Sequence, residues 1–350
     1  MSSRDIEVMS QDRYLARHIS IPMGGSTTMM TAEEAAAAFD GHRGYLTAVA
    51  YRMLGTLADA EDVVQEAYLR FARADLDAIR EPRGWLTTVI GRICLDHLSS
   101  ARVRREQYVG AWLPEPLVGS DAGLGMAPLT PEDRITLDES VSMAMLVVLE
   151  SLSPPERTAF VLHDVLSLSY EEVATTVGRS EAACRQLISR ARGHVREKAP
   201  RFTVDVQQQN AVVEAFLNAC ADGGVDTLVK VLAPDVVLRS DGGGLVSGVA
   251  RRPVIGAENV ARLLLGVAAK HPAFPWRRRV NGASGLVFEG SDGIAGVMAF
   301  TVDDGRITEI DFVVNPEKLS RVPLPSGGEP SSTSGDNSGA APSLGESESP

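Results

Sequence analysis

The chain has 350 residues, with 34 Lys and Arg against 46 Asp and Glu, so its formal net charge is −12, and 44% of its residues are hydrophobic. At about 150 residues per domain this length indicates two or three domains, and the apolar content excludes a disordered chain. No apolar run approaches the roughly 18 residues that span a bilayer, and residues 1–20 lack the apolar core of a signal peptide, so we expect a cytoplasmic protein.

Two basic segments lie within this acidic chain. Residues 80–107 contain six Arg against three acidic residues, and residues 179–201 contain six Arg and one Lys against two acidic residues. Binding to a polyanion depends on the local field rather than on the net charge, so both segments are candidate nucleic-acid contacts. The alternative is a pair of solvated helix faces. The three cysteines stand far apart without CxxC or CxxH spacing, which argues against a disulfide framework and a structural zinc site.

The first predicted domain is helical and spans 31–105. Residues 1–30 are expected to be an irregular extension, with Met1, Met23, Met29 and Met30 as alternative starts. Thr31, followed by Glu34 at its N3 position, resembles a capping box, and helical periodicity continues to Arg105. Within it, an acidic helix over 59–71 and a helix from Arg83 are separated by a loop over 73–82.

A Pro- and Gly-containing linker is predicted over 106–135. Its segment 108–116 carries Tyr108 and Trp112, whose apolar area would be wasted in a solvated tether. We therefore expect these side chains to dock on a partner surface or on another domain.

The second predicted domain, 136–200, contains a helix-turn-helix. Ser153, Pro154 and Glu156 form a helix start, and a short helix then runs from Ser169 to the stop at Gly178. After a turn, a helix spans 181–196, which completes the helix-turn-helix pattern.

The last of these helices has two chemically different faces. At about 100° per residue, its apolar side chains cluster on one side and its small, polar and cationic side chains point the other way. Arg pairs with guanine, Gln with adenine, and Ser with either base, so the polar face suits a DNA groove. The predicted DNA-contacting residues here are Ser180, Ala182, Arg185, Gln186, Ser189, Arg190, Arg192 and Arg196.

Residues 204–318 are predicted to form an α+β domain. Helical segments over 204–220 and 227–232 precede strand-like runs at 236–238, 286–288, 294–302 and 306–314, and a further helix spans 257–269. Asp303-Asp304-Gly305 is a hairpin turn between the last two strands. Residues 319–350 are rich in Ser, Gly and Pro and are expected to be a disordered tail.

Several motifs in register resemble the extracytoplasmic-function sigma factors of bacterial RNA polymerase. These motifs lie at residues 59–68, 82–86, 152–157, 170–174 and 190–192, and the resemblance covers about 31–200. The segments 112–116, 184–191, 241–244 and 315–319 are similar to a subgroup with a SnoaL-like C-terminal extension. The expected fold is therefore two all-α domains followed by a cone-shaped α+β domain.

This resemblance implies binding to core RNA polymerase and to promoter DNA. The acidic helix would bind polymerase through Asp59, Asp62, Gln65 and Glu66. The loop 73–82 and the helix after it would read the non-template single strand, with Arg80, Arg83 and Arg92 as cations. Trp85 would either stack on a base or fill the helical core. The helix at 181–196 would read the duplex of the upstream promoter element.

For the C-terminal domain the resemblance implies regulation rather than catalysis. Its expected interdomain contacts are Tyr108, Trp112, Pro114, Pro116, Asp241, Gly242, Gly243 and Gly244. Asp241, Asp311 and His271 are candidate acid or base residues, but no spacing fixes a reaction, and we predict no enzyme, cofactor or metal. A small-molecule ligand in the cone is an open alternative. The alternative function is a stand-alone helix-turn-helix regulator with a ligand-sensing or enzymatic domain, which would have no use for the acidic helix.

Overall fold

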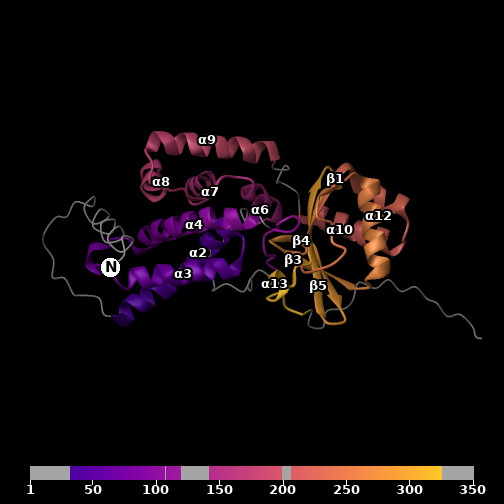
Figure 1. Cartoon of the computed structure of the whole chain (residues 1–350), viewed down its shortest axis with the longest axis horizontal. Coiled ribbons are helices and arrows are strands. Elements are labelled where there is room, and N and C mark those ends of the chain that lie inside the picture. The colour runs from indigo at the N-terminus through magenta and orange to yellow at the C-terminus, as the bar shows by residue number, and fades with distance from the viewer. Residues whose placement is uncertain (1–31, 107, 120–141, 199–205, 325–350) are drawn as a thin grey trace, which may run out of the picture.

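The computed structural model of the protein describes residues 32–106, 108–119, 142–198 and 206–324. A helical body forms one end of the molecule, and a sheet with its covering helices forms the other (Figure 1). The extension expected over 1–30, the linker after Gly119 and the tail after Leu324 lie outside the described residues.

The first part of the helical body contains α2 (Ala32–Leu54), α3 (Leu57–Phe71), the 3-10 turn η1 (Leu76–Ala78) and α4 (Pro82–Glu106). Gly55, at φ +80°, lies between α2 and α3 in a conformation that glycine adopts without strain. Thr56 caps α3 by accepting a hydrogen bond from the amide of Asp59 at 3.3 Å. The predicted loop and the two helices beside it are therefore present.

The second part contains α6 (Met143–Glu150), α7 (Pro154–Phe160), the π-helical turn η3 (Val161–Val165), α8 (Tyr170–Val177) and α9 (Glu181–Lys198). Ser169 and Glu172 form a reciprocal capping box: the Ser169 amide donates to Glu172 at 2.7 Å, and the Glu172 amide donates to the Ser169 hydroxyl at 3.3 Å. Gly178 ends α8 in the left-handed region at φ +69°. These contacts confirm the predicted helix-turn-helix.

The two helical parts share one continuous hydrophobic core, which runs from Phe39 in α2 to Ala191 in α9. α4 packs against both α7 and α8. The two parts lie close together at Gly91, where an added Cβ would lie 2.7 Å from Cγ2 of Thr176. Within the described residues, no helix is both long and apolar enough to cross a membrane.

The C-terminal domain is α+β, as expected. It contains α10 (Val206–Ala221), α11 (Val225–Val231), β1 (Leu232–Asp241), β2 (Val254–Ile255), α12 (Ala257–Lys270), β3 (Phe274–Val280), β4 (Ala283–Gly290), β5 (Gly293–Asp303), β6 (Arg306–Val313) and α13 (Pro316–Leu319). The strands form one sheet in the order β2-β1-β6-β5-β4-β3. Neighbouring strands pair antiparallel except β1 and β6, which run parallel.

The sheet has two differently covered faces. Helices α10, α11 and α12 pack on the helix-covered face around an apolar cluster that includes Phe216, Leu286 and Phe300. The opposite, linker-covered face packs against Leu113 and Met143. The expected start of the tail at Leu319 was too early, because Leu319 and Val322 are buried in this second cluster.

Candidate nucleic-acid and polymerase interfaces

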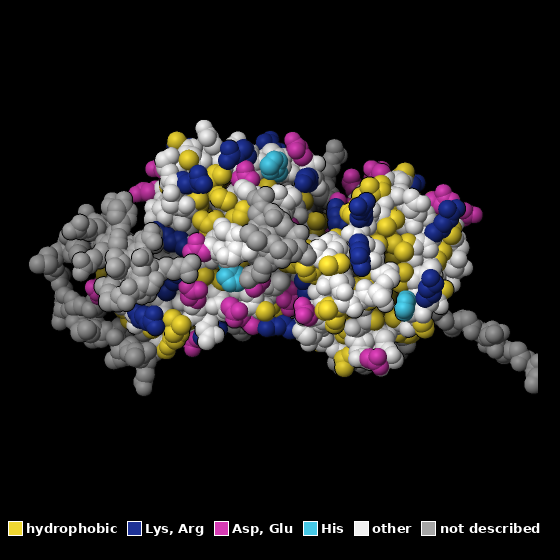
Figure 2. Space-filling view, viewed as in Figure 1, with side chains coloured by type: hydrophobic (Ala, Val, Ile, Leu, Met, Phe, Trp, Pro, Cys, Tyr) yellow, Lys and Arg dark blue, Asp and Glu magenta, His cyan; other side chains and the backbone are white. Residues whose placement is uncertain are grey.

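The polar face of α9 lies on the outside of the helical body. Cys184, Leu187, Ile188 and Ala191 are buried beneath the helix, whereas Arg185, Gln186 and Ser189 are exposed. Lys and Arg side chains follow the upper edge of the molecule over α9 (Figure 2). The predicted faces of this helix are confirmed, because helical periodicity alone determines which side is apolar.

Several α9 cations already have partners within the protein. Arg185 pairs with Glu181 at 2.9 Å and lies 4.7 Å from the centre of the Tyr170 ring. Arg190 pairs with Glu156 at 2.9 Å. The Arg185–Glu181 pair is exposed on both sides and therefore weak, so an anionic partner can replace its carboxylate. The Glu156 carboxylate that binds Arg190 is buried.

Arg192 and Arg196 continue the basic side of the helix. The guanidinium of Arg192 donates to Asp164 at 2.8 Å, and this contact raises the pKa of Arg192. Arg196 donates to the backbone carbonyl of Arg192 at 3.3 Å. At the start of the helix, Ser180 is exposed and its hydroxyl accepts from the Ala183 amide at 3.3 Å. Ala182 is also exposed and leaves room for close approach.

The three cations predicted to contact the non-template single strand do not all lie together. Arg80 is exposed before α4, and the guanidinium of Arg83 lies 3.9 Å from the centre of the Tyr45 ring. Trp85 packs partly buried against the helical core, 5.8 Å from Phe71, which favours the core alternative for this side chain. Arg92 instead donates to the backbone carbonyl of Thr175 in α8 at 2.8 Å. In this arrangement Arg92 therefore joins the two helical parts.

The acidic face of α3 is exposed, and acidic side chains gather over it (Figure 2). Two of the carboxylates predicted to bind polymerase have partners within the protein. Glu66 pairs with Arg70 one turn later at 2.6 Å, and Asp59 accepts from the Thr56 hydroxyl at 2.6 Å. An i,i+4 pair of this kind is worth only a few tenths of a kcal/mol, so Glu66 can still bind a basic partner. Asp62 and Gln65 are exposed on the same helix.

The linker segment and the C-terminal domain meet at Asp241, the last residue of β1, which is fully buried. The Tyr108 hydroxyl and the Leu113 amide donate to its two carboxylate oxygens at 2.6 and 2.9 Å. Lys318 pairs with the same carboxylate at 2.7 Å. Its ammonium lies 4.0 Å from the centre of the Trp112 ring, a cation–π contact. Burial, and then the neighbouring Asp241, raise the pKa of Tyr108.

The glycines after Asp241 are packed closely. An added Cβ would lie 3.1 Å from Val249 at Gly242, 2.5 Å from the Asn315 amide at Gly243 and 3.1 Å from Val109 at Gly244. A side chain at any of the three positions would therefore meet a neighbouring segment. Pro114 and Pro116 are buried, so all eight predicted interdomain residues lie in or beside this junction.

Two junction residues were missed by the sequence reasoning. Asn281, in the turn between β3 and β4, donates to the hydroxyl of Tyr51 in α2 at 2.9 Å. Its carbonyl oxygen accepts from the Leu117 amide at 3.1 Å. Glu115 accepts from the amide of Leu57, at the start of α3, at 2.7 Å, and burial raises the pKa of its carboxyl group. Asn281-Gly282 is a hairpin signal, but nothing local indicates its partner.

The three candidate acid or base residues have different environments. Asp241 holds the linker, and His271 is exposed at the end of α12. Asp311 alternates with the apolar residues of the helix-covered face, so it lies on the opposite face, paired with Arg239 at 3.0 Å. Burial raises the pKa of Asp311 to about 6 despite the opposing effect of Arg239.

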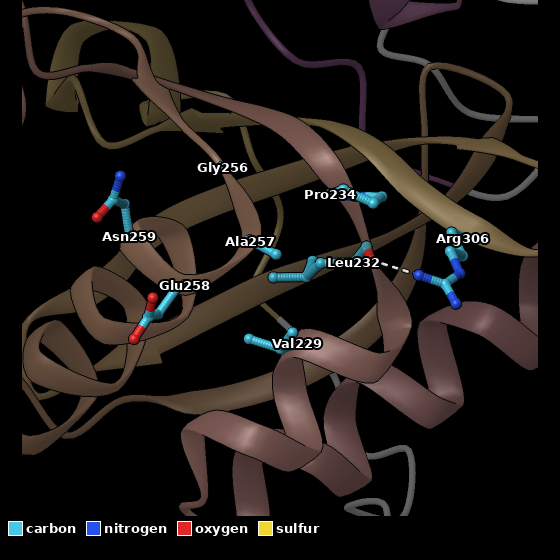
Figure 3. A pocket seen from close by; sticks show the side chains of 8 residues that line it. All are labelled: Val229, Leu232, Pro234, Gly256, Ala257, Glu258, Asn259 and Arg306. Carbon is cyan, nitrogen blue, oxygen red and sulfur yellow. Dashed lines mark hydrogen bonds between the residues drawn. The ribbon is translucent and has the colours of Figure 1, made fainter.

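A hollow of about 370 Å³ lies between α11, the start of β1 and the start of α12 (Figure 3). Its polar side chains are Glu258, Asn259 and Arg306. Figure 3 shows that these groups point apart, and Arg306 is directed toward the carbonyl of Leu232. They do not converge on a position where a ligand would be held.

Comparison with known proteins identifies the arrangement. Residues 38–104 match the family described as Sigma-70 region 2, and residues 142–195 match Sigma-70, region 4. The "Probable ECF RNA polymerase sigma factor SigI" of Mycobacterium tuberculosis is 38% identical over 296 residues, covering 83% of this chain and 97% of its own length. The ECF RNA polymerase sigma factor SigJ of the same species is 41% identical over 298 residues, covering 82% and 93%. The chain belongs to the ECF RNA polymerase sigma factor family.

The relationship extends through the C-terminal domain of this sigma factor. The crystal structure of Mycobacterium tuberculosis SigJ matches it with a TM-score of 0.66 at 39% identity, covering 83% of this sigma factor and 99% of that chain. The resemblance drawn from the sequence motifs is thereby confirmed. As a sigma factor, the protein binds core RNA polymerase and directs promoter recognition at the start of transcription.

Proposed function

We propose that three surfaces of this sigma factor bind three different partners during transcription initiation. α3 binds core polymerase through Asp59, Asp62, Gln65 and Glu66. Arg80, before α4, and Arg83, in the first turn of α4, contact the non-template single strand. The outer face of α9 enters the major groove of the upstream promoter element. The observation that carries this division is the exposure of Arg185, Gln186 and Ser189 above a fully apolar inner face.

The division is tested by assembly and transcription with the full chain. Purified core polymerase and the sigma factor are expected to form a holoenzyme that starts transcription from a promoter fragment. An Arg185→Ala, Gln186→Ala variant should still form the holoenzyme but bind that fragment less tightly. Loss of holoenzyme formation in this variant would contradict the separation of the two surfaces.

We also propose that the C-terminal domain is a regulatory domain without enzymatic activity. Contacts between the domains support this proposal. Asp241 pairs with Lys318 and accepts a hydrogen bond from the linker, and Asn281 donates a hydrogen bond to the first helical part. Asp241 and Asp311 lie on the same face of neighbouring strands, but their carboxylates are paired with Lys318 and Arg239. His271 is exposed at the end of α12. A small-molecule ligand is not favoured, because the side chains of the hollow in Figure 3 do not converge.

Exchange of the Leu113 amide tests the docking on which this regulation depends. An Asp241→Asn variant loses the charge that pairs with Lys318, so the amide of Leu113 is expected to exchange faster than in the parent. Transcription from the same promoter should change, although neither DNA-contacting surface is altered. Unchanged exchange and unchanged transcription would contradict the proposed regulatory role.

A further inference from the structure

Glu61 on α3 is bound by a residue from the other end of the chain. Arg321, just after α13, donates from its two terminal nitrogens to the two carboxylate oxygens of Glu61 at 2.6 and 2.8 Å. This bidentate geometry satisfies both oxygens and is the strongest form of an Arg–carboxylate contact. The pKa of Glu61 is lowered, chiefly by this hydrogen bonding.

The linker segment 108–116 contacts the start of α3. The Glu115 amide donates to the carbonyl of Gly55 at 2.8 Å, and the Glu115 carboxylate accepts from Leu57 at 2.7 Å. Trp112 lies so close to Gly55 that an added Cβ there would be 2.7 Å from its ring. The linker therefore contacts α3 at its start, and the C-terminal domain contacts it at Glu61.

The rest of the helix presents a different surface. Asp62, Gln65 and Glu66 are exposed, and Leu69 on the same side is 47% exposed. This sequence of acidic and apolar groups suits a partner that offers basic and apolar side chains. Among the exposed acidic side chains of α3, Glu61 contacts the C-terminal domain, whereas Asp62 and Glu66 do not within the described residues.

We propose that the C-terminal domain and core polymerase compete for α3. Arg321 binds Glu61 at the position that a basic side chain of polymerase would otherwise occupy. This inference rests on the proposed role of α3 in polymerase binding. While Arg321 binds both oxygens, Glu61 cannot offer the same bidentate edge of its carboxylate to a second guanidinium. Binding of polymerase at Glu61 therefore releases Arg321, and retention of Arg321 weakens polymerase binding by the same factor.

The solvent exposure of the Arg321–Glu61 pair limits how strongly it can affect polymerase binding. The side chains of Arg321 and Glu61 are 42% and 48% exposed, so water and salt screen their attraction. Exposed ion pairs make small contributions, which correspond to about a two- to fivefold change in an equilibrium constant. The contact adjusts polymerase affinity and does not block it.

The test measures core polymerase affinity of the full-length protein by titration at low salt. Arg321→Ala should bind about two- to fivefold more tightly than the parent, and the difference should shrink at higher salt. In a Glu61→Gln background, Arg321→Ala should have no further effect, because the shared carboxylate is gone. Arg262→Ala is the matched control: Arg262 pairs with Glu258 on the exposed face of α12, away from α3.

The outcomes separate this inference from the proposed function. If Arg321→Ala binds core polymerase no more tightly than the parent while Asp62→Arg destroys binding, the shared surface is refuted and the role of α3 survives. The same refutation follows if Arg321→Ala changes the affinity equally with and without Glu61. If Asp62→Arg binds as well as the parent, the proposed role of α3 is itself refuted.

Discussion

Asn281 donates a hydrogen bond from its side-chain amide to the hydroxyl of Tyr51, 2.9 Å away and 230 positions earlier in the chain. Tyr51 in turn donates to the backbone carbonyl of Glu115 at 2.6 Å. Three segments, α2, the linker and the β3–β4 turn, therefore meet at one buried hydroxyl. Desolvation by this burial is the main reason that the pKa of Tyr51 is raised.

Replacing Asn281 by glycine should loosen this junction. Asn281 has φ +48°, which glycine tolerates, so Asn281→Gly removes the amide without adding backbone strain. Leaving the Leu117 amide and the Tyr51 hydroxyl less well satisfied should cost about 1–3 kcal/mol in the free energy of unfolding. Chemical denaturation measures this loss. Asp304→Gly, at an exposed turn with φ +47°, is the control and should change stability by less than about 0.5 kcal/mol.

Gly91→Ala should disturb the contact between α4 and α8. The new Cβ would lie 2.7 Å from Cγ2 of Thr176 and 3.3 Å from Leu162, and such overpacking costs about 1–3 kcal/mol. Gly41→Ala, in α2 with nothing within 4 Å, should instead leave stability unchanged or raise it by up to about 1 kcal/mol. Thermal unfolding compares the two variants. Equal effects would show that the helices are not held closely at Gly91.

Arg185→Ala and Gln186→Ala should each weaken binding to the upstream promoter element. Both side chains lie on the exposed face of α9, and loss of a good base contact costs about 1–3 kcal/mol. Titration of a duplex promoter fragment measures the effect. Arg262→Ala removes a comparably exposed Arg from an i,i+4 pair with Glu and should bind as the parent does. Undiminished binding by both α9 variants would overturn the assignment of this face.

The buried Asp311 should give stability a pH dependence. Its pKa of about 6 exceeds the ordinary value of 3.8, so the folded protein holds the proton more tightly than the unfolded chain. Its stabilising contribution is present below about pH 4 and is lost as the pH rises through about 6. Asp311→Asn should therefore match the parent near pH 4 and become the more stable protein at pH 7. Denaturation at both pH values decides this, and a variant that is relatively weaker at pH 7 would contradict it.

Local signals predicted much of the helical body. Ser169, Glu172 and Gly178 mark the ends of α8 through contacts within one or two turns, and the buried side of α9 follows from its own periodicity. The docking of the linker aromatics was also predictable, because Tyr108 and Trp112 would lose apolar area to water in a free tether. Tyr108 contacts Asp241, and Trp112 contacts Lys318.

Contacts between distant segments could not be predicted in the same way. Arg92 was assigned to DNA because its charge is visible in the sequence, whereas its partner is a backbone carbonyl of α8. β3 was missed because its run of Arg277, Arg278 and Arg279 hides the strand periodicity at the sheet edge. Arg321 was placed in a tail because the composition around it is Pro- and Ser-rich, although it reaches Glu61.

Holoenzyme assembly by an Asp62→Arg, Glu66→Arg variant tests whether α3 binds core polymerase. The reversed charges should repel a basic partner, so the folded variant is expected to lose core polymerase binding and promoter-directed transcription. Glu258→Arg is the control, since it reverses the acidic member of an exposed i,i+4 pair on α12 and should assemble as the parent does. If the folded variant binds core polymerase as tightly as the parent does, α3 is not the polymerase-binding surface.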